Sequence, residues 1–314
     1  MSKKLVLFDH DGAIDDILAT MLLMTMPHIQ PLGVIVTPAD CYINAALSVT
    51  RKLLDFMGCH QIPVAESTVR GINPFPALYR RDSLIMDNFP ILNQQDTLKT
   101  PLVPESGQEF MVNTLQNAAE PVTLMVTGPL TTVATALEMN PEIEAKIKEI
   151  VWMGGALNVL GNVEREFAPE QDGTAEWNAY WDAIAVDRVW QTQIPLILCT
   201  LDITNTVPVT SEFIRKLAKQ RHYPLSDLAG LCYALAIPQD YYCWDVLATA
   251  YLHRPELFSV KSWETEVITT GSSQGRIKIV DSGRQILAMD TVDKEAFHHY
   301  LLQQWGSLND GEIV

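Results

Sequence analysis

The chain alternates between short apolar runs and longer segments in which apolar residues recur at helical spacing. The apolar runs are rich in β-branched residues and have the length of buried strands, at residues 5–8, 32–37, 122–128, 150–155 and 195–200. The helical patterns occupy residues 15–25, 43–57, 130–139 and 175–190. This alternation is typical of parallel strands joined by helical crossovers, so we expect an α/β fold.

The last third of the chain departs from this alternation. It is helical in pattern over residues 211–257, with prolines as punctuation. Three short strand-like runs follow, with glycine-containing turns between them, at residues 265–270, 275–281 and 284–290. These runs predict an antiparallel meander, and a final helix is expected near residues 294–305. We predict that residues 1–314 form one domain with an elaborated C-terminal part.

Composition and charge narrow the classes of function. The 314 residues are 47% hydrophobic, and the formal net charge of −16 is spread along the chain. Such an acidic surface repels polyanions, so neither nucleic acid nor an anionic membrane is an expected partner. Five cysteines without a CxxC pair suit reduced thiols, and the apolar stretches are too short for a signal-peptide core or a membrane span. We therefore expect a cytoplasmic protein.

Four aspartates gather where the first predicted strand meets the first predicted helix. The segment DHDGAIDD places Asp9 and Asp11 on one face of the strand end, and Asp15 and Asp16 in the first helical turn. Two like charges about 4 Å apart repel by roughly 4 kcal/mol at an effective dielectric near 20. A helix N-terminus offsets only about 0.3–1 kcal/mol of this. The balance predicts a bound hard cation such as Ca²⁺ or Mg²⁺, because only oxygen ligands are available.

Other interpretations of this segment lead to different functions. Helix capping in water would account for Asp15 or Asp16 alone, but not for all four aspartates. An EF-hand is excluded, because Ile14 and Thr20 stand where its loop requires glycine and glutamate. The strand followed by DHDG also resembles the DxDGT opening of haloacid-dehalogenase-type phosphatases, although Ala13 replaces the threonine of that family. A DxD-type phosphatase therefore stays the alternative enzyme.

Other strand ends are expected to complete the site. In open α/β sheets, ligands bind beyond the carboxyl ends of the strands. At such places the sequence has Thr127 in VTGPL, the segment MGGALNVLGN after the next strand, and Trp244 and Asp245 in YYCWD before a later helix. Asp245 would add a further carboxylate to the cation site.

These segments together resemble the nucleoside hydrolases. DHDGAIDD is similar to the DxDxxxDD opening of that family, and VTGPL, WMGGA, DGTAEWN and WD follow in the family's order. TPADC, NPFP and TNTVPV make the chain more similar to the purine-preferring inosine-adenosine-guanosine branch. The resemblance covers about residues 5–252. It implies a mixed, mostly parallel sheet flanked by helices, with one Ca²⁺ at the bottom of a pocket.

The resemblance also implies roles for individual residues. The Ca²⁺ ligands would be Asp11, Asp16, Asp245 and the backbone carbonyl of Thr127. Asp11 would in addition be the general base for a calcium-bound water. The ribose 2′- and 3′-hydroxyls would be bound by Asp15, Asn178 and Asp245, and the 5′-hydroxyl by Asn162 and Glu176. Carboxylates around the ribose would stabilise the oxocarbenium charge that develops when the C1′–N bond breaks.

On the base side, the resemblance implies a preference for purines. Trp244 would stack on the purine, where the pyrimidine-tolerant branch has a histidine. Because an indole is not a useful proton donor, stacking would favour a purine that takes its proton from solvent. Tyr79 is the candidate for a second stacking residue, and Asp40 is either an aspartate near the base or a turn residue. For Trp177 and Met153, pocket wall and core packing are both open.

The sequence thus predicts a Ca²⁺-dependent purine nucleoside hydrolase that releases free base and ribose. Two alternatives stay open: the phosphatase, and a nucleoside-binding protein that has lost turnover. The expected partner is a small-molecule nucleoside. The resemblance also suggests a homo-oligomer, a dimer in this branch.

Overall fold

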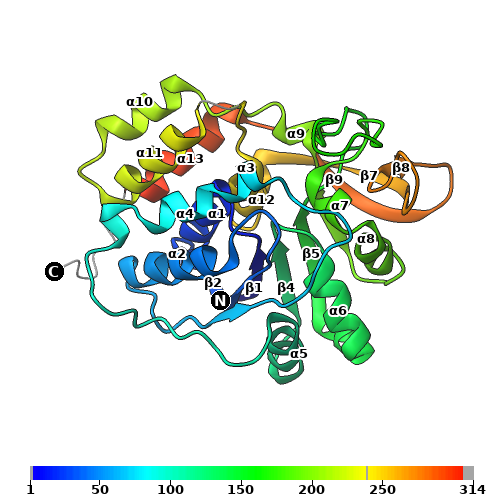
Figure 1. The fold of residues 1–314 in the computed structure, drawn as a ribbon, viewed down its shortest axis with the longest axis horizontal. Coiled ribbons are helices and arrows are strands. Elements are labelled where there is room, and N and C mark those ends of the chain that lie inside the picture. The colour runs from blue at the N-terminus through cyan, green and yellow to red at the C-terminus, as the bar shows by residue number, and fades with distance from the viewer. Residues whose placement is uncertain (1–2, 238–239, 307–314) are drawn as a thin grey trace.

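One sheet runs through the molecule in the computed structural model, which describes residues 3–237 and 240–306 (Figure 1). In these residues the sheet has nine strands in the order β3-β2-β1-β4-β5-β6-β9-β7-β8. Every neighbouring pair from β3 to β9 is parallel, whereas β7 is antiparallel to both β9 and β8. The predicted α/β fold with a mostly parallel sheet is confirmed. The strands are β1 (Lys4–His10), β2 (Ile29–Val36), β3 (Val64–Glu66), β4 (Val122–Val126), β5 (Ile147–Met153), β6 (Leu196–Cys199), β7 (Phe258–Val267), β8 (Ile277–Ile279) and β9 (Arg284–Val292).

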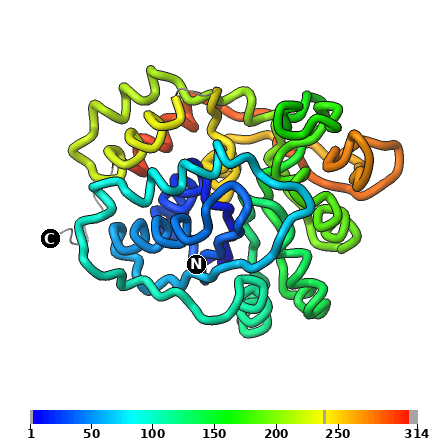
Figure 2. Tube along the Cα trace, in the orientation of Figure 1, coloured from blue at the N-terminus to red at the C-terminus, as the bar shows by residue number. Residues whose placement is uncertain are grey.

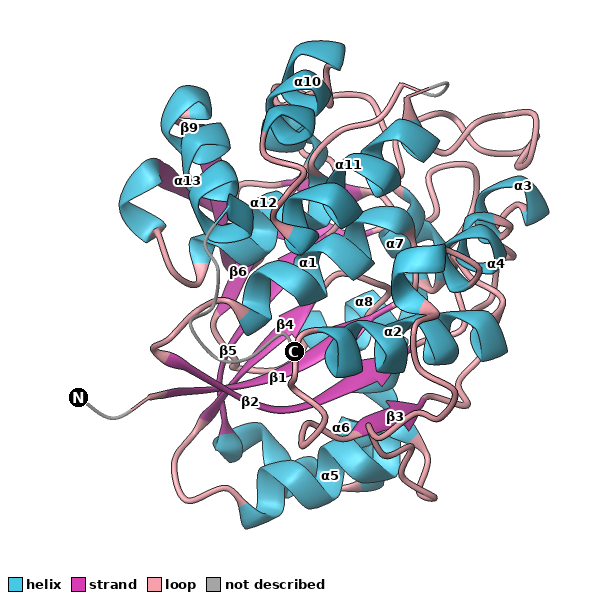
Figure 3. Ribbon diagram, turned by 90° about the vertical axis from the view of Figure 1, so that its left-hand side faces the viewer, coloured by secondary structure: helices cyan, strands magenta, loops and turns pink. Residues whose placement is uncertain are grey.

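Helices cover both faces of the sheet, as the side view shows (Figure 3). The longer ones are α1 (Ile14–Met24), α2 (Ile43–Phe56), α5 (Gly107–Asn117), α6 (Thr131–Met139), α8 (Ala183–Trp190), α10 (Ser211–Lys219), α11 (Pro224–Ala236), α12 (Trp244–Tyr251) and α13 (Lys294–Gly306). The shorter ones are α3 (Ala77–Arg80), α4 (Asp82–Asp87), α7 (Trp177–Trp181), α9 (Leu201–Thr204) and the 3-10 turns η1 (Pro90–Leu92), η2 (Pro141–Lys146) and η3 (Pro255–Leu257). Helices α1, α2, α11 and α12 pack on one face, and α5, α6 and α8 on the other.

The strands are apolar throughout because both of their faces are buried. In β1, Val6 and Phe8 point into the core beneath α1 and α12, while Leu7 points into the core beneath α5 and α6. All three side chains are fully buried. Burial of one such side chain stabilises the fold by about 1.5–3 kcal/mol, which explains why these runs lack the polar alternation of a half-exposed strand.

Helix α1 packs against α12 and α13, although these helices come from opposite ends of the chain. Figures 1 and 2 show the blue N-terminal helix close to the yellow and red C-terminal ones. The first turns of α1 and α12 meet, since the backbone N–H of Asp245 donates to the Asp15 carboxylate over 3.1 Å. This packing brings two acidic segments of the sequence together at one edge of the sheet.

The turn from β1 into α1 depends on Gly12. Its φ is +85°, and a Cβ there would lie 2.6 Å from Ala46 Cβ and 2.8 Å from Cys41 Cβ. Only glycine fits both conditions, since a positive φ is unfavourable for other residues and the neighbours leave no room for a side chain. The turn sets Asp11 immediately before the helix that carries Asp15 and Asp16.

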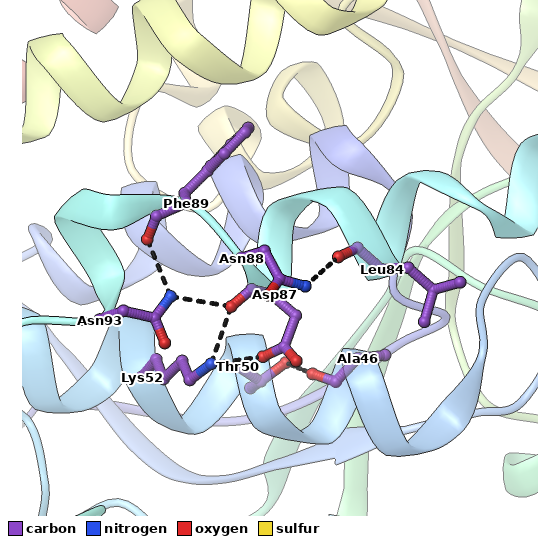
Figure 4. Close-up of polar contacts among 8 residues, drawn as sticks. All are labelled: Ala46, Thr50, Lys52, Leu84, Asp87, Asn88, Phe89 and Asn93. Carbon is purple, nitrogen blue, oxygen red and sulfur yellow. Dashed lines mark hydrogen bonds and ion pairs between the residues drawn. The ribbon is translucent and has the colours of Figure 1, made fainter. Parts of the chain in front are cut away.

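A polar cluster fastens α4 and the following turn onto α2 (Figure 4). Lys52 Nζ donates to the carbonyl of Asp87 at 2.8 Å and to its carboxylate at 2.7 Å. Asn93 Nδ2 donates to the same Asp87 carbonyl and to the carbonyl of Phe89, both at 2.9 Å. The cluster therefore fixes the end of a segment that begins at α3, close to the functional site described below.

The structure differs from the sequence-based expectations in several elements. The helix expected over residues 175–190 is two helices, because Asp182 between α7 and α8 has φ −150° and ψ 79°. The C-terminal strands pair antiparallel as expected, but not as a meander: β7 lies between β9 and β8, and β9 continues the parallel sheet beside β6. Helix α5 was not expected, and neither was the three-residue strand β3.

No helix among the described residues has the length and apolar content needed to cross a membrane.

Candidate active site

A cavity of about 920 Å³ opens at the carboxyl edge of the parallel strands. Of the thirteen side chains predicted to form a site, all but Asp16 line this cavity. Those that line it are Asp11, Asp15, Asp40, Tyr79, Thr127, Met153, Asn162, Glu176, Trp177, Asn178, Trp244 and Asp245. The structure thus brings together residues from β1 to α12, as expected for ligands that bind beyond the strand ends.

Asp11 lines the cavity, and Asp16 lies next to it outside the lining. Asp11 accepts a hydrogen bond from the Asp40 backbone at 3.2 Å, and Asp16 is fully buried behind it. The Asp16 carboxylate accepts from Thr127 Oγ1 at 2.5 Å and from the Ala13 backbone at 2.8 Å. Burial, and then the nearby Asp16 carboxylate, raise the pKa of Asp11 well above its usual range.

Asp15 and Asp245 lie side by side at the start of α1 and α12. Burial, and then the Asp16 carboxylate, raise the pKa of Asp15 to about 6. Burial, and then Asp15, raise the pKa of Asp245 well above its usual range. Tyr241, which the sequence analysis did not single out, donates its hydroxyl to Asp15 Oδ1 at 2.7 Å. Its sequence signal was its place in the segment YYCWD, which ends in two predicted site residues.

Glu176, Asn178 and Asn162 form the opposite wall of the cavity. The buried Glu176 carboxylate accepts three backbone N–H groups, from Gly155 at 2.9 Å, Asn178 at 2.8 Å and Ala179 at 3.1 Å. Asn178 Nδ2 donates to the carbonyls of Thr127 at 2.8 Å and Met153 at 3.1 Å. Asn178 is thereby held by two strand ends, and its Oδ1 is the atom left to accept a ligand hydroxyl.

Tyr79 lies at the mouth of the cavity in an edge-on arrangement. Its hydroxyl donates to Glu164 at 2.5 Å, and Glu164 also accepts from Trp177 Nε1 at 3.0 Å. The Tyr79 ring is at 83° to the Trp177 ring, with centroids 6.3 Å apart. Glu164 comes from the polar loop over residues 160–174 and was not predicted as a site residue, because its role depends on contacts that are remote in sequence.

Aromatic and acidic side chains also line the cavity, among them Trp244, Tyr241 and Asp40. The Trp244 ring lies edge-on to Tyr241, with centroids 4.6 Å apart and an interplanar angle of 72°. Burial, and then the Asp16 carboxylate, raise the pKa of Asp40 well above its usual range, and its buried Oδ1 lacks a hydrogen-bond partner among the described contacts. Of the described residues that line the cavity, none is a histidine and Arg81 is the one cation.

Two residues left open by the sequence both line the cavity and pack in a core. Trp177 is 6% exposed and belongs to a small apolar cluster with Phe75, Val163 and Trp181, and Met153 is 3% exposed at the end of β5. Each of these two side chains is therefore both part of the pocket wall and part of the core. Asp9 lies beneath the site, where it accepts from Thr37 Oγ1 at 2.8 Å, and burial raises its pKa to about 8.

The donor set at the base of the cavity suits a hard cation in its chemistry. Carboxylates from Asp11, Asp15 and Asp245 face one space, and every donor there is oxygen. In the described part of the chain, no group of three or more His, Cys, Asp and Glu side chains is arranged as a metal site. Two of the expected donors are engaged instead: the Thr127 carbonyl accepts from Asn178, and both Asp16 oxygens accept hydrogen bonds.

Known proteins that are similar to this chain identify its family. The family model for inosine-uridine preferring nucleoside hydrolases matches residues 6–299. The pyrimidine-specific ribonucleoside hydrolase RihA of Citrobacter koseri is 30% identical over 294 residues, 88% of each chain. A crystal structure of an inosine-uridine preferring nucleoside hydrolase from Bacillus anthracis is 41% identical, with a TM-score of 0.94 over 97% of this chain and 100% of that one.

A more distant structure agrees with these in fold alone. The purine-preferring ribonucleoside hydrolase from Gardnerella vaginalis is 20% identical, with a TM-score of 0.78 over 96% of this chain and 98% of that one.

The phosphatase interpretation of DHDG is wrong, because the family match includes this segment and nearly all of the chain. The chain belongs to the inosine-uridine preferring nucleoside hydrolase family and is therefore an N-glycosyl hydrolase.

Proposed function

We propose that this protein hydrolyses the N-glycosidic bond of purine ribonucleosides and releases free base and ribose. The observation that carries the proposal is the convergence of Asp11, Asp15, Asp245 and Trp244 on one cavity. The carboxylates supply negative charge where the ribose becomes an oxocarbenium ion, and the indole supplies a flat apolar surface for a base.

Asp11 is the proposed catalytic residue. It takes the proton of the attacking water while the water oxygen bonds to C1′, and the electron pair of the C1′–N bond moves to the base nitrogen. Burial of Asp11 and the nearby Asp16 raise its pKa, which makes it a stronger base than an exposed carboxylate once it is ionised. Asp15, Asn178 and Asp245 are proposed to bind the 2′- and 3′-hydroxyls, and Asn162 and Glu176 the 5′-hydroxyl.

Ca²⁺ is the proposed cofactor, held by Asp11, Asp16, Asp245 and the Thr127 carbonyl. When bound, the ion orients a water molecule and lowers its pKa. The all-oxygen donor set supports this choice of metal. The Thr127 carbonyl has a second lone pair beside the one that accepts from Asn178, so the hydrogen bond leaves it able to act as a ligand.

The preference for purines is supported by Trp244 and by the lining of the cavity. A purine offers Trp244 two fused rings to stack on, and the described lining residues include no imidazole to protonate a pyrimidine as it leaves. A pyrimidine preference is the competing proposal, because the RihA relatives are described as pyrimidine-specific at 27–30% identity.

A reducing-sugar assay over inosine, adenosine, guanosine, uridine and cytidine tests the proposal. We expect ribose release from the purine nucleosides, little from uridine, and loss of activity with a chelator that Ca²⁺ restores. Equal turnover of inosine and uridine would contradict the purine preference. Nucleosides that bind without release of ribose would instead identify a binding protein that has lost turnover.

Replacing Asp11 tests its role directly. We expect Asp11→Asn to reduce turnover of inosine by several orders of magnitude without unfolding the protein, because the amide keeps the shape but takes no proton. Asp187→Asn in α8 is the matched control, since the Asp187 carboxylate accepts a hydrogen bond from Gln191 and does not line the cavity. Activity of Asp11→Asn near that of the control would reject the general-base assignment.

A further inference from the structure

The hydroxyl of Tyr241 forms two hydrogen bonds with Asp15. It donates to Asp15 Oδ1 at 2.7 Å and accepts from the Asp15 backbone N–H at 3.2 Å. The second carboxylate oxygen, Oδ2, accepts from the Asp245 backbone at 3.1 Å. Both oxygens of Asp15 are thereby fixed in direction, by donors that come from the residues just before and at the start of α12.

A neutral donor matters at this position because the surroundings are negatively charged. Asp15 is 2% exposed and shares its end of the cavity with Asp11 and Asp245, and Arg81 is the one cation among the described lining residues. Repulsion from the other carboxylates would turn an unrestrained side chain away from them. The Tyr241 hydroxyl donates to one carboxylate oxygen of Asp15, and the Asp245 backbone donates to the other. The Asp245 side chain also hydrogen-bonds to Asp15, so Tyr241 is the neutral side chain that helps to orient Asp15 among carboxylates.

The same side chain also contacts the base side of the cavity. The Tyr241 ring lies edge-on to the Trp244 ring at 4.6 Å. Its backbone carbonyl accepts from Val209 at 2.9 Å, and the Cys243 N–H donates to Val207 at 3.0 Å. Tyr241 is thus anchored by its own backbone while its ring and hydroxyl reach two different parts of the site.

We propose that Tyr241 is a positioning residue that orients Asp15 toward a ribose hydroxyl and supports the Trp244 indole, so that one side chain links recognition of the sugar and of the base. The inference rests on the proposed function, because it takes the hydroxyl that Asp15 binds from that assignment. Tyr241 itself takes no part in proton transfer. Its contribution is a carboxylate held in the direction that a ribose hydroxyl requires.

Tyr241→Phe, which keeps the ring and removes the hydroxyl, tests the proposal. We expect kcat/KM for inosine to fall by about 10- to 100-fold, the range for loss of one hydrogen bond to a charged group. Most of the loss should be in kcat, because bonds to the ribose hydroxyls strengthen as the oxocarbenium ion forms. With 2′-deoxyinosine or 3′-deoxyinosine, whichever lacks the hydroxyl that Asp15 binds, the loss should shrink to less than about threefold.

Tyr300→Phe is the matched control. Tyr300 on α13 is also buried and its hydroxyl also hydrogen-bonded, to His253 Nδ1 at 2.9 Å, but it does not line the cavity. We expect this variant to lower the thermal midpoint as Tyr241→Phe does, with kcat/KM within twofold of wild type. An equal loss in both variants, or a Tyr241→Phe loss that is the same for inosine and for both deoxy analogues, would overturn the proposal.

Calorimetric titration with the same three nucleosides separates this inference from the proposed function. If the wild-type protein releases no ribose from any nucleoside, the proposed reaction is wrong. The inference is then supported if Tyr241→Phe weakens binding of inosine by at least about tenfold and binding of one deoxy analogue by less than threefold. It is overturned if inosine binds both proteins equally, or binds neither.

Discussion

Two glycines determine the position of Asp11. Gly12 allows the turn that follows Asp11, and Gly128 leaves the space that the Asp11 side chain occupies. A Cβ on Gly128 would lie 2.8 Å from Asp11 Cβ and 3.1 Å from its Cγ. Contacts below about 3 Å between such atoms force a displacement. The position of the proposed general base therefore requires glycine at both residues.

Gly128→Ala is expected to lower kcat for inosine at least tenfold. The added methyl displaces Asp11 by a few tenths of an ångström or more, and misplacement of a catalytic group on that scale is costly. Steady-state kinetics beside a thermal melt would measure the effect. Gly230→Ala in α11 is the control, because the nearest atom to its Cβ is 4.0 Å away and alanine is the better helix former. Unchanged kinetics in Gly128→Ala would show that the position of Asp11 tolerates movement.

The sequence analysis identified the site residues that stand in recognisable motifs. It missed the site residues whose roles depend only on contacts in the folded chain. The four aspartates, Trp244 and the strand-end Thr127 stand in short motifs, so their convergence was predictable from the carboxyl-edge rule. Tyr241 and Glu164 have no such motif. Their roles follow from partners 226 and 85 residues away in sequence, and only the folded chain reveals these.

At the scale of elements, the site depends on how well short segments are fastened. The segment around α3 and α4 carries Tyr79 and Arg81 at the mouth of the cavity, and α3 buries none of its residues. The cluster of Lys52, Asp87 and Asn93 fixes the end of this segment (Figure 4), and Arg80 and Ser83 fasten its start by hydrogen bonds to Cys41 and Tyr42. The Lys52 and Asp87 side chains are only 16% and 24% exposed, so solvent screens their ion pair less than a surface pair.

Lys52→Ala is expected to lower the free energy of unfolding by about 1–2 kcal/mol, because it removes two hydrogen bonds from a charged donor and takes away the ion-pair partner of the Asp87 carboxylate. Urea unfolding measures this. Lys216→Ala removes an ion pair with Glu212 in which the side chains are 47% and 70% exposed, so it should lower the free energy of unfolding much less than Lys52→Ala does. Equal effects of the two substitutions would show that the cluster in Figure 4 does not fasten α4.

Elements were predictable from the sequence where their periodicity is long and uninterrupted. The strands buried on both faces and helices α1, α2 and α6 fall within a few residues of expectation. Helix α5 was missed although Ser106 and Glu109 form a capping box at its start, a signal that apolar periodicity alone does not use. The break between α7 and α8 arises from tertiary contacts, since Asp182 caps α8 through Ala185 and accepts from Thr131 on α6.

At the scale of the whole molecule, the site concentrates negative charge in a protein that is already acidic. The net charge is −16, and burial raises the pKa of six carboxyls in or beneath the cavity, namely Asp9, Asp11, Asp15, Asp40, Glu176 and Asp245. Raised values mean that these groups oppose folding when they are ionised and no cation is bound. Stability, pH and metal should therefore be linked through this one site.

The sign of the pH dependence follows from these shifts. Between an ordinary carboxyl pKa near 4 and the raised values, about 6 for Asp15 and about 8 for Asp9, the folded protein binds more protons than the unfolded chain. Its stability then falls as the pH rises. His10, His253 and His298 act in the opposite sense below about pH 6.5, because burial lowers their pKa. Toward pH 8 the histidines no longer oppose this trend. The thiols of Cys41, Cys59, Cys199, Cys232 and Cys243, whose pKa is raised by burial, then act in the same sense as the carboxyls.

With a chelator present, we expect the free energy of unfolding to fall between pH 6.5 and 8, by about 1.4 kcal/mol per pH unit for each proton by which the two states differ. Urea unfolding at pH 6.5, 7.2 and 8.0 measures this slope, and Asp9→Asn should reduce it. Ca²⁺ at about 100 times its dissociation constant should add about 2.7 kcal/mol at pH 8 and flatten the slope, because it favours the ionised carboxylates. The prediction would be contradicted if the chelated protein had the same free energy of unfolding at pH 8 as at pH 6.5. Ionisation of these carboxyls would then not destabilise the fold, and there would be no repulsion between them for Ca²⁺ to reduce.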